Sequence, residues 1–306
     1  MLTEAVNRYL AVRRAVGFTL TAEGRLLNRF AEFADARGQH TISSAIAIEW
    51  AGSARSVPQR ARRLGLVIRL ARYLRAEDGR HEIPPAVFGA DRFSRPTPYI
   101  LTLAQIRAVI QAAAQSGYRA HRALRRATYS TLFSLLACTG LRVSEAIRLR
   151  YDDLTPDGLI IRRSKFGKSR LVPLHQTAQA GLERYLRQRR PFTPADDHVF
   201  VSLNKTALRI NDVDKAFRTA VDRAGVPRRP GRQSRATPHS LRHSFATRAL
   251  QTCPPGRDAI TRQMVALSTY LGHSTAAHTY WYLEAIPDLM RDIANEAEQA
   301  VMGGQS

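Results

Sequence analysis

The sequence predicts a mainly α-helical protein in two parts, with a small antiparallel β-hairpin or sheet in the second part. The chain has 306 residues, which suits about two domains. Apolar residues recur at helical spacing through most of the chain. Four prolines between residues 84 and 98 exclude a continuous helix from one part to the other. With 44% hydrophobic and 24% charged residues, the composition is typical of a folded chain.

Residues 1–88 are expected to form a small helical bundle. Three separate stretches, around Leu10, Phe30 and Val67, carry apolar residues at helical spacing that can pack on one another. The third stretch also leaves a basic face once its apolar stripe turns inward. The arginines expected on that face include Arg60, Arg62, Arg63, Arg69 and Arg72. Residues 89–98 then form a proline-rich linker.

The second part, residues 99–284, begins with a clear helix start. Thr102 and Gln105 form a capping box ahead of an apolar periodic run. A strongly apolar helix is expected over 123–139 and should end at Gly140. Further helices are expected at about 176–190, 211–225, 240–250 and 259–271.

One β signal interrupts the helices. The runs 159–163 and 169–174 are short and extended, and residues 164–168 between them contain a glycine. This arrangement predicts a hairpin.

The charge of the chain points to a polyanionic partner. There are 47 Lys and Arg against 25 Asp and Glu, a formal charge of +22, which predicts binding to nucleic acid. No apolar run approaches the roughly 18 residues of a membrane span, and the N-terminus lacks a signal peptide, so we expect an intracellular protein without a membrane partner. Cys138 and Cys253 match no disulfide framework or metal-ligand spacing, and Cys138 should be buried on its apolar helix.

The final stretch, residues 285–306, differs from the rest. It places Ile286, Leu289 and Ile293 on one helical face, and residues 283–306 contain five acidic residues and one Arg. An acidic segment with an apolar stripe suits docking onto protein and not onto nucleic acid.

Four short strings carry the groups needed for phosphodiester chemistry. They are 139–145 (TGLRVSE), the hairpin tip, 239–247 (HSLRHSFAT) and 271–282 with its LGH and Tyr residues. Two guanidinium groups can clamp the oxygens on which charge grows at phosphorus. A lysine can protonate the departing alkoxide, imidazoles can assist, and a Tyr hydroxyl can form a covalent intermediate. Because the cations supply the electrostatic stabilisation, no metal or other cofactor is expected.

In these strings the chain resembles the tyrosine recombinases of the phage integrase and Xer type. The family's order of Arg, Lys, His-x-x-Arg, His and Tyr is kept across about 140 residues. The positions that match its catalytic residues are Arg142, Lys165, His239, Arg242, His273 and Tyr282, with Glu145 as the supporting acidic residue.

The resemblance implies a site-specific DNA recombinase that cuts and rejoins DNA through a 3′-phosphotyrosyl intermediate. It implies a helical core-binding (SAM-like) domain at 1–88, a catalytic domain at 99–284 and a C-terminal helix at 285–306 for protomer docking. The implied partners are a double-stranded recombination site and a homotetramer on synapsed DNA, or a heteromer with a sister recombinase. A cytoplasmic, nucleoid-associated enzyme of DNA integration or transposition, carried by a mobile element, fits this pattern.

Several alternatives remain open at this stage. Lys168 competes with Lys165, because the hairpin reads SKFGK where the family commonly has GKGxK. Tyr280 lies two residues before Tyr282, and on a helix only one of them can face the phosphate. His243 is expected to be structural. A type IB topoisomerase shares this chemistry, and a catalytically inactive DNA-binding factor could retain the same fold.

Overall fold

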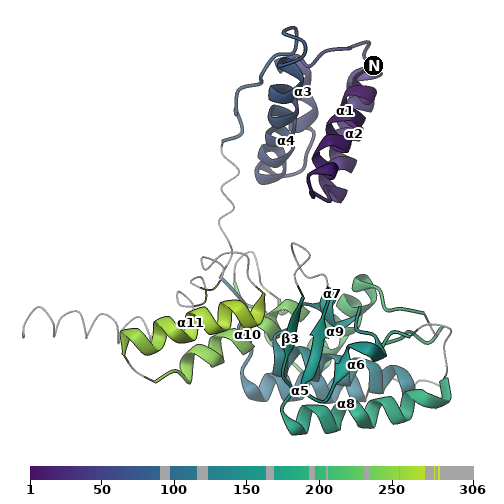
Figure 1. Cartoon of the computed structure of the whole chain (residues 1–306), viewed down its shortest axis with the longest axis vertical. Helices are drawn as coiled ribbons and strands as arrows, with labels where there is room; N and C mark the ends of the chain where they lie inside the picture. The colour runs from purple at the N-terminus through teal and green to yellow at the C-terminus, as the bar shows by residue number, and fades with distance from the viewer. Residues whose placement is uncertain are drawn as a thin grey trace, which may run out of the picture. The chain divides into compact units, whose positions relative to one another are not determined.

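The computed structural model describes residues 1–89, 97–115, 123–162, 169–192, 197–204, 206–230, 235–254, 256–272, 279 and 282. The chain divides into two compact units, Met1–Arg95 and Pro96–Ser306, which are described separately below (Figure 1). None of the described helices is long and apolar enough to cross a membrane.

The first unit is a bundle of helices α1 (Leu2–Ala15), α2 (Thr21–Asp35), α3 (Ser44–Gly52) and α4 (Val57–Arg75). Its core contains Phe30 from α2 and Trp50 from α3, whose rings meet edge to face at 5.3 Å. The Asp35 carboxylate accepts hydrogen bonds from the backbone N–H groups of Leu2 and Thr3, at 2.9 and 3.2 Å. These bonds tie the start of α1 to the end of α2.

The second unit is built around a central helix, α6 (Ala123–Thr139). Leu132, Phe133 and Leu136 of α6 are fully buried in the largest core. Helices α5 (Leu103–Ala114), α8 (Gln176–Arg189), α9 (Ile210–Arg223) and α10 (Pro238–Gln251) all pack against α6. Short turns of helix follow at α7 (Val143–Ala146), η2 (Tyr151–Asp153) and η4 (Arg190–Phe192).

The helix starts and ends agree with the sequence in several places. Thr102 and Gln105 form the expected capping box at α5, and the Thr102 hydroxyl accepts from the Gln105 N–H at 3.2 Å. Gly140 follows the last residue of α6 with a left-handed φ of +62°. The mainly α-helical fold class is therefore confirmed.

A small antiparallel sheet of order β1-β2-β3 completes the second unit. The strands are β1 (Leu154–Thr155), β2 (Gly158–Ile161) and β3 (Arg170–Val172), and Leu159 pairs with both Leu154 and Val172. Strands β2 and β3 confirm the predicted hairpin, whereas β1 was not predicted. The hairpin tip, residues 163–168, lies outside the described residues.

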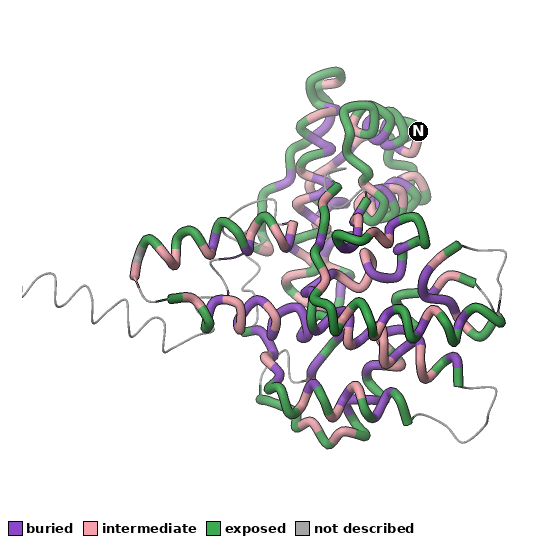
Figure 2. Tube along the Cα trace, turned by 60° about the horizontal axis from the view of Figure 1, so that its bottom comes forward, coloured by how far each residue is buried: buried purple, intermediate pink, exposed green. Residues whose placement is uncertain are grey.

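A second, smaller core lies between α10 and α11 (Arg257–Leu271). It contains Ala246, Leu250, Leu267, Leu271 and Tyr282. Figure 2 shows buried and exposed residues alternating along the helices, as amphipathic packing requires. This core brings a residue from the end of the described chain against α10.

Candidate active site

The turn after α6 positions Arg142. A Cβ on Gly140 would lie 2.5 Å from Cδ1 of Phe245, so glycine is required both by its φ and by the close packing. The chain then places Arg142 as the N-cap of α7. The Arg142 backbone N–H donates to Glu145 Oε2 at 3.0 Å, and its Nη1 donates to Oε1 at 2.9 Å. Glu145 thus holds both the backbone and the side chain of Arg142.

Arg242 on α10 is almost completely buried, with 1% of its surface exposed. Its Nη1 donates to the Gly140 carbonyl at 2.7 Å, and its Nη2 donates to the Leu271 carbonyl at 2.8 Å. Burial, followed by the positive charge of Arg142, lowers the pKa of Arg242 to about 10. The group therefore stays protonated at neutral pH.

The carboxylate of Glu145 lies between two arginines. Besides Arg142, it accepts from Nη1 and Nη2 of Arg170 at 3.1 and 2.9 Å. Burial alone would raise the pKa of Glu145, but hydrogen bonds from the Arg170 side chain and the Arg142 backbone outweigh it and lower this pKa. Glu145 is ionised at neutral pH, where it offsets part of the local positive charge.

Helix α10 carries two histidines, His239 and His243, close to the arginines and to Tyr282. The rings of His239 and His243 meet edge to face at 4.3 Å. His239 is exposed to solvent, but desolvation by the protein around its ring, and then the charges of Arg242 and Arg142, lower its pKa to about 4. His239 is therefore neutral at neutral pH in the DNA-free protein.

Tyr282 is buried against His243, with 2% of its surface exposed. Its hydroxyl lies 3.3 Å from Nδ1 of His243, within hydrogen-bonding distance. His243 directly follows Arg242 on α10, so the phenol lies beside the helix that carries this arginine. One chain thus brings Arg142, Arg242, His239 and Tyr282 together.

The remaining residues predicted from the sequence fall into two groups. Lys165, Lys168, His273 and Tyr280, and the segment 285–306, lie outside the described residues. The predicted arginines of α4 are all described: Arg69 and Arg72 are exposed, and Arg62 forms an ion pair with Glu23 at 3.1 Å. Arg60 and Arg63 donate to the carbonyls of Ala54 and Trp50 near the end of α3.

Two side chains at this site were not among the predicted catalytic residues, namely Arg170 and His243. Arg170 shares a face of β3 with the buried Val172, while Leu171 between them is 49% exposed. Because side chains alternate between the two faces of a strand, the position of Arg170 two residues before the apolar Val172 could have indicated that it lies on the inward face. His243 was expected to be structural, and the structure places it beside the Tyr282 hydroxyl.

Two open grooves meet at Arg142 and Ser144. One has a volume of about 940 Å³ and also contains Arg148, and the other has about 860 Å³ and also contains Arg218 and Arg228. These last three arginines are exposed and form no ion pair with any described residue. Exposed arginines therefore line both grooves beside Arg142.

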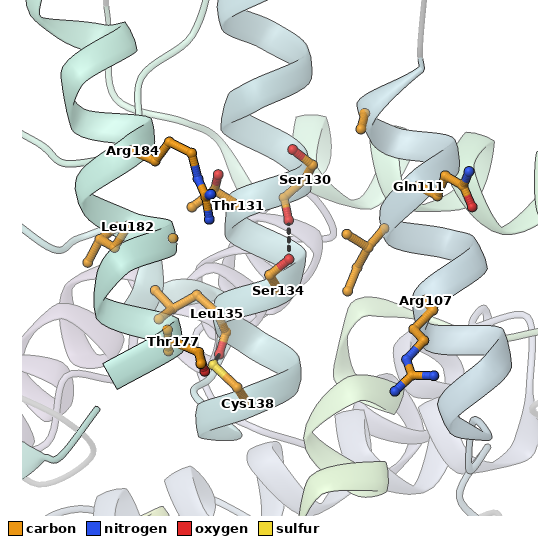
Figure 3. Close-up of a pocket in the computed structure, with 14 residues that line it drawn as sticks. Arg107, Gln111, Ser130, Thr131, Ser134, Leu135, Cys138, Thr177, Leu182 and Arg184 are labelled. Carbon is orange, nitrogen blue, oxygen red and sulfur yellow. Dashed lines mark hydrogen bonds between the residues drawn. The ribbon is translucent and has the colours of Figure 1, made fainter. Parts of the chain in front are cut away.

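A further pocket, of about 450 Å³, lies between α5, α6 and α8 and contains none of the predicted catalytic residues (Figure 3). Cys138 lies on its wall, with Arg107 and Arg184 at its edges. The expectation of a buried Cys138 was wrong, because the residue faces this pocket and is exposed. Desolvation of the thiol still raises its pKa to about 11, so it is not a reactive thiolate.

No cluster of three or more His, Cys, Asp or Glu residues suited to a metal ion occurs in the described part of the chain. His239 and His243 lie on one face of α10. The charged side chains near His239 are those of Arg242 and Arg142, and a guanidinium group cannot ligate a metal.

Comparisons with known proteins identify the family of the chain. Residues 100–287 match the phage integrase family. A putative integrase/recombinase of Sinorhizobium fredii, y4rB, is 36% identical over 305 residues, covering 97% of this chain and 96% of that protein. The tyrosine recombinase XerD of Brucella abortus (strain 9-941) is 29% identical over 247 residues, covering 77% and 74% of the two chains.

Two solved structures show the same fold. The integrase of the Tn1549 transposon, in complex with transposon right end DNA, superposes with a TM-score of 0.69 at 18% identity over 99% of each chain. The XerH site-specific recombinase bound to palindromic difH superposes with a TM-score of 0.66 at 20% identity, over 90% of this chain and 79% of that one.

The fold, the clustered arginines and the adjacent tyrosine define a tyrosine-type DNA strand transferase. The chain belongs to the phage integrase family, whose match covers most of its length.

Replacing Glu145 by Gln should destabilise the second unit by roughly 3 kcal/mol at neutral pH, because two arginines lose a buried partner. The folded-state pKa of Glu145 lies below its ordinary value of 4.5. The stabilisation is therefore fully present above that pH and is lost as the pH falls through the folded-state pKa. Urea unfolding of the wild type and Glu145→Gln from pH 7 to about pH 3 measures the difference.

Glu183→Gln is the matched control, since this carboxylate is exposed on α8 and contacts only Gln179 at 3.3 Å among the described residues. If Glu145→Gln lowers the free energy of unfolding no more than the control does, or lowers it more as the pH falls, Glu145 does not stabilise the site as a buried carboxylate.

Proposed function

We propose that the chain exchanges DNA strands at specific sites by two successive transesterifications. The Tyr282 oxygen attacks a backbone phosphorus, the bond from phosphorus to the 5′-oxygen breaks, and a 3′-phosphotyrosyl link and a free 5′-hydroxyl result. A 5′-hydroxyl from the partner duplex then reverses the step. Because the number of phosphodiester bonds is unchanged, no ATP is required. The observation that most supports this proposal is the position of the Tyr282 hydroxyl, which lies 3.3 Å from Nδ1 of His243, the residue after Arg242 on α10.

The two arginines would stabilise the phosphorane. Each guanidinium has five N–H donors, and Arg242 uses only part of this set on the carbonyls of Gly140 and Leu271. The contacts made with protein fix the orientation of the group before DNA binds. Oriented donors of this kind favour the transition state, because they need no reorganisation when charge develops.

The proton transfers would fall to residues around the arginines. On the family's pattern, Lys165 protonates the departing 5′-oxygen, and His239 and His273 assist the tyrosine and hold the phosphate. The pKa of His239 is lowered to about 4 by desolvation and by Arg242 and Arg142. A bound phosphate adds negative charge beside it and raises this pKa, so His239 accepts a proton more readily on DNA than in the free protein.

The two grooves that meet at Arg142 would follow the DNA backbone on either side of the scissile phosphate. Arg148 in one groove, and Arg218 and Arg228 in the other, are the exposed cations available to neighbouring phosphates. In the first unit, Arg62, Arg69 and Arg72 on α4 are the exposed members of the predicted DNA-binding set, and Arg62 is paired with Glu23. Both units would then contribute to the electrostatic part of the affinity.

The acting form would be a homotetramer on two synapsed duplexes, or a heteromer with a sister recombinase. Residues 1–88 would act as the core-binding domain, 99–284 as the catalytic domain, and 285–306 as the helix that docks onto a neighbouring protomer. We place this activity on DNA in the cytoplasm, within the nucleoid. Integration or transposition of a mobile element is the role we favour, because the close relative in Sinorhizobium fredii is named an integrase/recombinase.

The nucleophile is tested with a suicide duplex that is nicked next to the scissile phosphate, so that the cleaved strand diffuses away. The wild type should form a covalent protein–DNA adduct that is stable in SDS. Tyr282→Phe should abolish the adduct, because it lacks the attacking oxygen. Tyr280→Phe is the matched control and should retain it.

Loss of the adduct in Tyr280→Phe but not in Tyr282→Phe would show that Tyr280 is the nucleophile. A wild type that forms no adduct would favour a DNA-binding factor without catalysis. Relaxation of supercoiled DNA that carries no paired site would favour a topoisomerase.

The groove arginines are tested by the salt dependence of DNA binding. Arg148→Gln and Arg218→Gln should each weaken binding and reduce the slope of log K against log salt by about 1, the value for one phosphate contact. Arg184→Gln is a control of equal charge on α8, which Figure 1 shows at the far end of the unit from α7. An equal loss of slope in the control would show that only net charge matters.

The docking segment is tested by deleting residues 285–306. Binding to a single duplex should persist, because the acidic segment does not favour contact with phosphates. Assembly of two duplexes into one complex, followed by native gel electrophoresis, should be lost. Intact synapsis and recombination by the shortened chain would rule out this role for the segment.

A further inference from the structure

We propose that Arg170 is a positioning residue for DNA cleavage, which acts by fixing the two groups that hold Arg142. This inference rests on the proposed function and adds to it a residue that lies outside the family motifs matched above. Arg142 has two side-chain partners among the described residues, namely the Glu145 carboxylate at 2.9 Å and the Gly272 carbonyl at 3.3 Å. Arg170 contacts both of these supports, the Glu145 carboxylate and the backbone at the end of α11.

The first support is Glu145. Arg170 donates from Nη1 to Oε1 and from Nη2 to Oε2, at 3.1 and 2.9 Å, so the two planar groups are paired at both ends. A bidentate pair fixes the orientation of the carboxylate as well as its position. Because Glu145 Oε1 is also the oxygen that accepts from Arg142 Nη1, the orientation set by Arg170 is passed on directly.

The second support is the end of α11. The Nε of Arg170 donates to the Tyr270 carbonyl at 2.8 Å. A Cβ on Gly272 would lie 2.9 Å from Arg170 Nη1 and 3.2 Å from its Cζ, so the guanidinium packs directly on the backbone of Gly272. Gly272 also has a left-handed φ of +62°. Its carbonyl, which accepts from Arg142, is therefore placed between the turn at the end of the helix and the Arg170 side chain.

Arg170 is not itself placed to bind the phosphate. All three of its nitrogens donate to protein acceptors, at 2.8, 3.1 and 2.9 Å. A lysine could supply the charge, but its single ammonium cannot make the parallel pair with Glu145 and the bond to Tyr270 together. The proposed role therefore depends on the shape of the guanidinium, and Arg170→Lys isolates that property.

The test compares two substrates in single-turnover cleavage by the full-length protein. One suicide duplex has the natural scissile phosphodiester, and the other has a methylphosphonate there, in which a neutral methyl group replaces one charged oxygen. With less negative charge at phosphorus, the reaction depends less on correctly aimed guanidinium groups. Arg170→Lys should cleave the natural substrate about 100-fold more slowly, the cost of losing one oriented donor. The deficit should shrink by about tenfold on the methylphosphonate, and the Kd for the duplex should stay within about twofold of the wild type.

Arg189→Lys is the control for loss of stability. Arg189 is 2% exposed and donates to the Tyr151 hydroxyl and to the backbone carbonyl of His198, neither of which holds Arg142. The variant should therefore lose stability and keep the wild-type ratio of cleavage rates on the two substrates. Gly272→Ala is a second route to the same effect, because its Cβ would push the Arg170 guanidinium away while Arg170 itself is kept. It should show the same substrate pattern, which keeps the proposal testable if Arg170→Lys does not fold.

Equal deficits on the two substrates, wild-type rates in Arg170→Lys, or a loss of DNA affinity that accounts for the slower cleavage would each overturn the positioning role alone. Absence of any adduct from the wild type on the natural substrate would overturn the proposed function and this inference with it. The two failures are therefore distinguishable.

Discussion

The Glu145 carboxylate is the contact on which the geometry of this site depends. It is 8% exposed and accepts hydrogen bonds from Arg142 and Arg170, which come from different parts of the second unit. Two cations that lie close together in a partly buried site repel each other, and a nearby anion offsets that repulsion. Glu145 is that anion, and its lowered pKa shows that the arginines favour its charged form despite burial.

The ends of two helices supply the rest of the compensation. Arg242 donates to carbonyls just after α6 and at the end of α11, namely those of Gly140 and Leu271. Arg142 and Arg170 donate to the Gly272 and Tyr270 carbonyls beside them. Carbonyls at a helix C-terminus have no partner within the helix and carry partial negative charge. Carbonyls at these helix ends thus offset part of the positive charge of three guanidinium groups. The net charge that remains at the site is positive, which suits a phosphate.

Much of the fold and part of the site could be predicted from the sequence, because the signals were local. The capping box at Thr102, the glycine stop after α6 and the hairpin strands each depend on a few adjacent residues. The contact between Arg170 and Tyr270 joins positions 100 residues apart, and no periodic pattern reports such a pair. The prediction of a buried Cys138 was wrong because α6 is apolar on most sides. The hydrophobic pattern of a helix does not indicate which of its apolar positions face a pocket.

We propose that the phenol of Tyr282 becomes bonded to DNA phosphorus within a site built by Arg142, Arg242 and Glu145. Peptide mapping by tandem mass spectrometry of the trapped adduct, after nuclease digestion of the DNA, tests it most directly. We expect one modified peptide, with the residual nucleotide on the oxygen of Tyr282. A nucleotide attached to Tyr280, or to a serine or histidine elsewhere in the chain, would contradict it.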